Sequence, residues 1–227
     1  MFSTAQIITI VLEIVAFVPA LVLHEFGHAL AAYKLGDPTA QKAGRLSFNP
    51  IRHIDPFGTV LLPIMLGLAG MPVFGYAKAV PYNPRYFEDP RKGDLIVGLA
   101  GPGMNLVQAL VGTLIAFVVY TFVPASLFVR GSVVYYVMIF LMLYVQINLF
   151  LMFFNLIPIP PLDGSSIFAF LMPEKYLPQY YRIQQYALPV FMIIIIVLPQ
   201  ILPINPFSWY LNVTAGNVFD LLFSFMG

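Results

Sequence analysis

The segment LVLHEFGHALAAY, residues 21–33, places two histidines and one glutamate within an otherwise apolar stretch. Apolar residues continue back to residue 7, so the run is longer than the ~20 residues that a transmembrane helix needs. His24 and His28 are four residues apart and lie on one face of a helix, where both rings can reach one metal ion. Glu25 is ~100° further around the helix and can approach a metal-bound water without being a ligand. This H-E-x-x-H pattern is typical of zinc proteases in which the glutamate is the general base.

The apolar surroundings of these three residues decide between a functional and a structural interpretation. A five-residue pattern also occurs by chance, and in a soluble chain a structural pair of histidines would be an equally good interpretation. Inside an apolar span, each ionisable residue costs ~2.5–3.5 kcal/mol on insertion scales and is functional by default. Three such residues within five positions therefore favour a site with a chemical role.

The composition of the chain is that of a membrane protein. Of its 227 residues, 60% are hydrophobic and 9% are charged, and the mean hydropathy is +0.87, whereas roughly 25% of residues are charged in soluble proteins. The net charge of +1 provides no basic surface for nucleic acid. Because the chain has no cysteine, any metal must be held by nitrogen and oxygen ligands.

Six apolar segments are candidate membrane elements: residues 7–33, 57–73, 95–123, 133–156, 183–202 and 207–225. We expect the first, third, fourth and fifth to span the bilayer, because each provides about 20 apolar residues. Prolines and glycines interrupt the second, which favours a re-entrant segment, and the weak sixth is either an interfacial helix or another span. The predicted fold is an all-α polytopic membrane protein with about five to six transmembrane helices. We expect one domain, residues 1–227, with a catalytic core at about 7–170 and C-terminal helices at 183–225.

The positions of lysine and arginine predict the topology of the chain. If 57–73 crosses the bilayer, the 11 basic residues divide 5 to 6 between the two sides. If this segment re-enters, ten of the 11 lie on one side and only Arg130 lies on the other. The positive-inside rule favours re-entry, with the histidine end of the first helix toward the cytoplasm. We therefore expect an integral protein of a prokaryotic cell membrane, with its site toward the cytoplasmic side.

Two stretches on that side flank the re-entrant segment, residues 42–50 and 74–84. We expect them to be extended or to form a short β-hairpin, and ordinary loops are the alternative. An extended edge would let an unwound substrate segment add to the protein as a strand.

A catalytic zinc with two histidine ligands needs a third protein ligand. The sequence offers His53, which is the only other histidine, or a carboxylate inside the membrane. The stretch FFNLIPIPPLDGSS, residues 153–166, ends a spanning helix with three prolines followed by Asp163. Asp163 is a candidate ligand, and a cap for the turn that ends this helix is the other interpretation.

Three motifs in this order resemble the site-2 protease family of intramembrane zinc metalloproteases: H-E-F-G-H at 24–28, G-P-G-M-N at 101–105 and N-L-I-P-I-P-P-L-D-G at 155–164. The resemblance covers residues 12–170, and its first and last motifs are the specific ones. No part of the sequence resembles the PDZ inserts or the CBS domain of this family. The resemblance therefore implies a compact form of the enzyme.

The same resemblance implies the roles of individual residues. It implies that His24, His28 and Asp163 bind one Zn²⁺ per chain. It implies that Glu25 activates water and that Asn155 helps to bind the scissile carbonyl or its oxyanion. The expected function is that of a zinc endopeptidase that cleaves membrane-protein substrates in or next to a transmembrane segment, within the lipid bilayer.

Two further residues and one competing function stay open at this point. Asn105 either meets the active site or belongs to a glycine-rich packing surface. His53, if it is not a ligand, either positions substrate and gates access or holds a loop. The competing function is a non-catalytic membrane protein of the same fold that binds a metal or a partner. Glu25 between the two histidines favours the enzyme, because metal binding alone does not need it.

Overall fold

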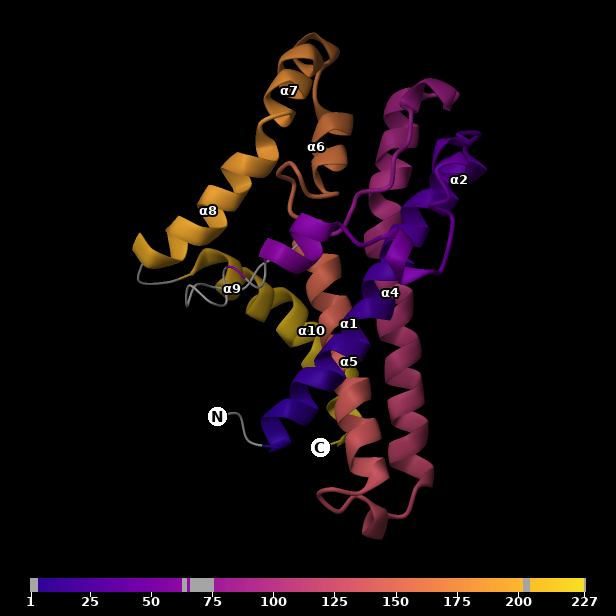
Figure 1. Ribbon diagram of the computed structural model, residues 1–227, viewed down its shortest axis with the longest axis vertical. Helices are drawn as coiled ribbons and strands as arrows, with labels where there is room; N and C mark the ends of the chain where they lie inside the picture. The colour runs from indigo at the N-terminus through magenta and orange to yellow at the C-terminus, as the bar shows by residue number, and fades with distance from the viewer. Residues whose placement is uncertain (1–3, 63–64, 66–75, 202–204, 227) are drawn as a thin grey trace.

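The computed structural model describes residues 4–62, 65, 76–201 and 205–226 (Figure 1). Its elements in chain order are α1 (Thr4–Lys34), α2 (Thr39–Lys42), η1 (Pro50–Arg52), η2 (Pro56–Leu61), η3 (Pro84–Tyr86), α4 (Pro90–Phe122), η4 (Ala125–Leu127), α5 (Val133–Asn155), α6 (Ser165–Leu171), η5 (Glu174–Tyr176), α7 (Leu177–Gln184), α8 (Ala187–Ile201), α9 (Pro206–Leu211), η6 (Asn212–Gly216), α10 (Asn217–Leu222) and η7 (Ser224–Met226). The prediction of an all-helical protein is confirmed for this part of the chain. It contains no β-strand, so the expected hairpin is not found there.

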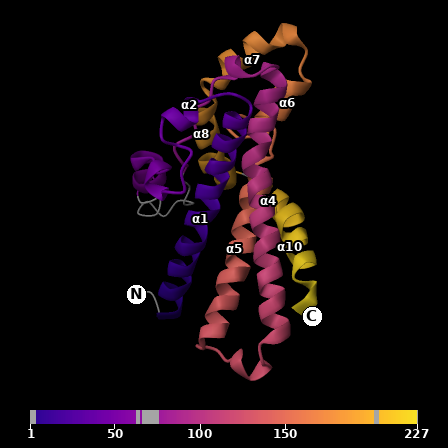
Figure 2. The same ribbon diagram turned by 90° about the vertical axis from the view of Figure 1, so that its right-hand side faces the viewer.

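Three long helices form the centre of the molecule, and α4 runs antiparallel to α1 and α5 and packs against both (Figures 1 and 2). Each is long and apolar enough to cross a membrane: Gln6–Lys34, Pro90–Phe122 and Val133–Asn155. Large apolar side chains such as Ile14, Val107 and Leu114 are exposed on these helices. Lipid tails satisfy such a surface, whereas water would not.

Small residues on α4 allow the helices to approach closely. The side of α4 that faces α5 carries Ala109, Gly112 and Ala116. Both alanines are fully buried in the main apolar core of the protein. A Cβ atom at Gly112 would lie 2.9 Å from Cγ2 of Val145, which is too close for a carbon contact. Close backbone approach through small residues is the usual way in which membrane helices associate.

Among the described residues, three helices can be identified as candidate spans, whereas the sequence predicts about five to six. The apolar run 183–202 is broken between the end of α7 at Gln184 and the start of α8 at Ala187. α8 then has 15 residues, fewer than the ~20 needed to cross. The segment 207–225 is divided among α9, the π-helical η6 and α10, and it packs against α5 through Ala215 and Phe223. The prediction of five to six spans is therefore not confirmed.

Most of the predicted re-entrant segment, 57–73, lies outside the described residues, but Gly58 and Thr59 near its start lie next to Tyr76, which follows the segment. The Tyr76 backbone N–H donates to the Gly58 carbonyl at 3.0 Å, and the Thr59 hydroxyl donates to the Tyr76 carbonyl at 2.8 Å. The chain therefore leaves and returns at the same place. α2 and the beginning of α4 lie at one end of the long helices, and the α4–α5 loop with Arg130 lies at the other (Figure 1).

Candidate metal centre

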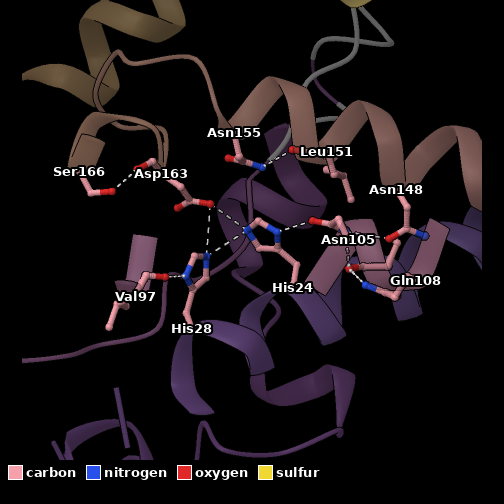
Figure 3. Close-up of polar contacts among 11 residues, drawn as sticks. His24, His28, Val97, Asn105, Gln108, Asn148, Leu151, Asn155, Asp163 and Ser166 are labelled. Carbon is pink, nitrogen blue, oxygen red and sulfur yellow. Dashed lines mark hydrogen bonds and ion pairs between the residues drawn. The ribbon is translucent and has the colours of Figure 1, made fainter. Parts of the chain in front are cut away.

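Three ligand atoms from two distant parts of the chain lie close together (Figure 3). His24 Nε2 is 3.1 Å from His28 Nε2, and these nitrogens are 3.2 Å and 3.3 Å from Asp163 Oδ2. Both histidines project from α1, and Asp163 belongs to the turn between α5 and α6. Within the described ranges, this is the one group of histidine and acidic side chains that could hold a metal ion.

The nearly equal sides of this triangle fit a tetrahedral zinc site. With metal–ligand distances of ~2.0–2.2 Å, two corners of a tetrahedron are ~3.3–3.6 Å apart. The observed separations of 3.1–3.3 Å are close to that value. Asp163 Oδ2 is buried and has no hydrogen-bond partner, which leaves its lone pairs for a cation. One ion can therefore contact all three atoms and keep a fourth position for water or substrate.

Asp163 has the charge that a metal ligand needs. Burial by itself raises the pKa of this carboxyl group, but His28 and His24, when Nε2 of each ring is protonated, outweigh burial and hold the pKa well below its usual value. The carboxylate is therefore ionised at neutral pH. A carboxylate and two imidazoles form a common ligand set for catalytic zinc.

Asn105 on α4 orients His24. The Asn105 amide nitrogen donates to the carbonyl of Ala20 at 3.3 Å and to Oδ1 of Asn148 at 2.8 Å, so its oxygen faces His24. His24 Nδ1 then donates to that oxygen at 2.5 Å (Figure 3). This bond places the imidazole proton on Nδ1 and leaves Nε2 free as a ligand.

His28 is oriented by the backbone of α4. Its Nδ1 donates to the carbonyl of Val97 at 2.7 Å, which also leaves Nε2 free. Gly101 lies one turn further along α4, where a Cβ atom would clash with His28 and lie 2.7 Å from Cε1 of His24. The glycine therefore allows α4 to pack directly on both imidazoles.

The turn that carries Asp163 is held by α4 and by its own backbone. Gly164 N–H donates to the Asn155 carbonyl at 2.6 Å, and a Cβ at Gly164 would clash with backbone carbonyls, including that of Ile157. The Ser166 hydroxyl donates to the Asp163 carbonyl at 2.7 Å, next to Gly98 of α4. These contacts explain why a glycine follows the aspartate: only a residue without a side chain fits there.

Arg91 at the start of α4 binds the end of α6, the helix that follows the Asp163 turn. Its Nη2 donates to the carbonyls of Ala169, Phe170 and Met172 at 3.2, 2.6 and 2.6 Å. These carbonyls belong to the end of α6, where the helix leaves its last acceptors unpaired. α6, and with it the Asp163 turn, is therefore tied to α4.

Glu25 lies next to the metal ligands and is 8% exposed. Its Oε2 is buried and has no hydrogen-bond partner. A buried, unpaired carboxylate oxygen is costly unless water, a proton or a ligand satisfies it. Glu25 is therefore arranged for a polar group that enters the site.

The structure places Asn155 at the last turn of α5, before the Asp163 turn (Figure 3). Its amide nitrogen donates to the carbonyl of Leu151 on its own helix at 2.9 Å, and the residue is partly buried. Asn155 and Asp163 thus lie near each other, with the Asn155 side chain held by α5 in this conformation.

His53 is not part of the ligand group. It is 1% exposed, its Nε2 donates to the carbonyl of Ser47 at 2.8 Å, and its own carbonyl accepts from the Lys78 backbone N–H at 3.0 Å. His53 also lines a cavity of about 600 Å³ between α1 and α5. The structure therefore places it in a loop and in a cavity wall.

Three residues around the centre were not identified from the sequence: Val97, Gln108 and Asn148. Val97 acts through its backbone carbonyl, for which a sequence carries no side-chain signal. Asn148 donates to the Tyr144 carbonyl, and Gln108 accepts from the Tyr144 hydroxyl at 2.6 Å, so both extend the hydrogen-bonded network that begins at His24. Polar residues within apolar spans are the signal that could have identified these two.

Comparison with known proteins places the chain in a family. YwhC of Bacillus subtilis, named "Putative zinc metalloprotease YwhC", is 36% identical over 183 residues, which cover 81% of this chain and 79% of YwhC. The sequence profile of "Peptidase family M50" matches residues 126–198, which include Asn155 and Asp163. The chain belongs to peptidase family M50, the site-2 proteases.

Two other relatives are less similar to this chain than YwhC is. Rip2 of Mycolicibacterium smegmatis, also named a "Putative zinc metalloprotease", is 33% identical over 72% of this chain and 59% of Rip2. MJ0611 of Methanocaldococcus jannaschii has the same description and is 28% identical over 73% of each chain. No solved structure matches the chain at a significant level. These names imply zinc, and the ligand triangle of this M50 chain is compatible with it.

Proposed function

We propose that this chain is a zinc-dependent intramembrane endopeptidase that hydrolyses peptide bonds in or next to transmembrane segments of membrane proteins. One observation carries the proposal: two of the three candidate ligands, His24 and His28, and the unpaired Oε2 of Glu25 lie together on α1, an apolar helix long enough to span, and Asp163 is brought to them. His24 is ten residues before the end of α1 at Lys34, or about 15 Å along the helix. The chemistry would therefore take place within the depth of the bilayer.

His24, His28 and Asp163 would hold the zinc ion, which when bound would lower the pKa of water to about 7 and polarise a carbonyl group. Glu25 accepts the proton of the attacking water and passes it to the leaving amine nitrogen. Asn155 leaves its bond to Leu151 and donates its amide N–H to the substrate carbonyl oxygen, whose negative charge grows during attack. The bonds of His24 to Asn105 and of His28 to Val97 keep both rings fixed throughout.

A cavity beside α1 supports a substrate that enters from the membrane. The cavity of about 600 Å³ lies between α1 and α5, and residues of the segment 50–59 also line it. Its wall on α1 includes Ile14, Val18 and Leu21. These residues are 11, seven and four positions before Glu25, so all point within about 40° of its direction around the helix. We propose that the membrane segment of the substrate lies here before it unwinds next to Glu25.

The basic residues support a site toward the cytoplasm. Lys34, Lys175 and Arg182 lie at the same end of the long helices as α2 and the start of α4, and only Arg130 lies in the loop at the opposite end. The positive-inside rule places the first end in the cytoplasm. We propose that the enzyme acts there in the cell membrane, in the reaction known as regulated intramembrane proteolysis.

The test is cleavage by the purified protein in detergent or lipid vesicles. One substrate carries a transmembrane segment, and its control carries the same cleavage sequence in a soluble peptide. We expect cleavage of the first, loss of that cleavage with a zinc chelator and recovery when zinc is returned. Equal cleavage of the soluble control would contradict an intramembrane substrate.

A further inference from the structure

Arg45 is a buried cation with two unsatisfied donors. It is 4% exposed and lies just after Gly44, whose positive φ of 67° ends the turn that follows α2. Its Nη2 donates to the carbonyls of Lys78 and Ala79, the latter at 3.1 Å. Nε and Nη1 are buried and have no hydrogen-bond partner. An arginine cannot lose its charge, so these N–H groups require an acceptor from elsewhere.

The loop that contains Arg45 packs against the part of α1 that carries Glu25. The rings of Phe48 and Phe26 have centroids 4.3 Å apart, and Leu46 packs against a buried cluster that includes Ala29. In agreement with this placement, burial lowers the pKa of Arg45 and the charge of Glu25 partly opposes that effect. The two side chains form no ion pair within 4.0 Å, as judged from the described residues. Oε2 of Glu25 is also buried without a partner. The region between the Arg45 loop and α1 thus contains unpaired donors on Arg45 and an unpaired acceptor on Glu25.

The chemistry of this region selects the group that would fill it. An anion would suit Arg45 but would be repelled by Glu25 and Asp163. An apolar side chain would leave all the polar atoms unsatisfied. A main-chain peptide unit satisfies both partners, because its carbonyl oxygen accepts from Arg45 and a neighbouring N–H donates to Glu25. The two carbonyls that hold Nη2 keep the guanidinium group in position for this role.

We propose that Arg45 donates hydrogen bonds to a main-chain carbonyl oxygen of the substrate next to the scissile bond. This inference rests on the proposed protease function. Arg45 fixes the substrate backbone relative to Glu25 and makes no contact with the substrate side chains. Its contribution is therefore the same for substrates of different sequence.

The first test compares Arg45→Met with Arg52→Met. Arg52 is exposed in η1, a few residues away, and is a matched control for the loss of one charge. We expect Arg45→Met to keep its zinc and to lose about 10- to 100-fold in kcat/KM, the effect of one lost hydrogen bond to a charged donor. Arg52→Met should remain within about twofold of the wild type. Equal activity in the two variants would overturn the proposal.

The second test separates substrate contact from a structural role of Arg45. Each main-chain carbonyl next to the scissile bond is replaced in turn by a thioamide, a weaker acceptor. We expect one thioamide to slow the wild type about tenfold and to have no further effect in Arg45→Met, as a double-mutant cycle requires. If Arg45→Met loses zinc, Arg45→Lys takes its place, and the thioamide effect should shrink. A thioamide effect that is equal in wild type and variant overturns the proposal. A wild type that cleaves no transmembrane substrate would contradict the protease function instead.

Discussion

His24 Nδ1 donates a hydrogen bond to Asn105 Oδ1 at 2.5 Å, so a residue of α4 sets the orientation of a ligand on α1. Asn105 is fully buried, and its own amide group is fixed by Ala20 and Asn148. The interaction therefore selects the tautomer of His24 in which Nε2 faces Asp163. Asn105 acts on the centre without being a ligand.

Removal of this interaction should weaken the metal site. We expect Asn105→Ala to reduce zinc affinity about 10- to 100-fold, because the ring of His24 loses the partner that fixes its tautomer. Thr113→Ala is the control, since Thr113 lies two turns after Asn105 on α4 and its hydroxyl donates to the Ala109 carbonyl of the same helix. Competition with a zinc-binding dye measures both affinities. An Asn105→Ala affinity equal to that of Thr113→Ala would contradict this role.

Gly101 and Gly103 on α4 provide a second pair of variant and control. A Cβ at Gly101 would clash with the rings of His28 and His24, whereas a Cβ at Gly103 meets nothing within 4 Å. We expect Gly101→Ala to lower zinc affinity at least about tenfold, because α4 must move away from the ligands. Gly103→Ala should bind zinc like the wild type. Similar zinc affinities in both variants would show that α4 does not pack closely against the imidazoles of His24 and His28.

The topology can be tested with single cysteines, because the chain has none of its own. Arg52, Arg85 and Arg130 are all exposed, so a cysteine at each position can be labelled by a membrane-impermeant reagent. We expect positions 52 and 85 to be labelled from the cytoplasmic side and position 130 from the other side. The hydrogen bonds that join Tyr76 to Gly58 and Thr59 support this result. Labelling of 52 and 85 from opposite sides would mean that 57–73 crosses the bilayer.

His53 should affect substrate and not metal. It lines the cavity between α1 and α5 and lies outside the ligand group, so we expect His53→Ala to keep its zinc and to raise KM or lower kcat/KM. Zinc content and cleavage of the same purified sample are the two measurements. If folded His53→Ala contained no zinc, the third ligand would be His53 and not Asp163.

The sequence was most informative where chemistry and local spacing coincide. The four-residue spacing of His24 and His28 specifies one helix face, and α1 holds both Nε2 atoms on one side of the site. The turn containing Asp163 was identified by its prolines and glycine, and the structure brings its carboxylate to the histidines. For Asn105 the sequence allows both a role at the site and a role in packing, because it does not show which face of α4 meets α1.

The sequence was less informative about tertiary contacts and helix ends. Hydropathy gave one apolar run at 183–202, but the helix ends at Gln184 and a shorter one begins at Ala187, since length and apolarity do not determine continuity. Arg45 was counted only as a cytoplasmic charge. Its burial depends on the carbonyls of Lys78 and Ala79, more than 30 residues away, and no local pattern predicts that contact.

The most direct test of the account is Glu25→Gln, with zinc content and cleavage of a transmembrane substrate measured on the same purified protein. Glu25 is not a ligand in the triangle formed by His24, His28 and Asp163, so the variant should keep one zinc per chain. It should lose cleavage by at least about 10²- to 10⁴-fold, because glutamine cannot accept the proton of the attacking water. The wild type should show both zinc and cleavage. Full cleavage by Glu25→Gln with zinc retained would contradict the account, because the water would then be activated without Glu25.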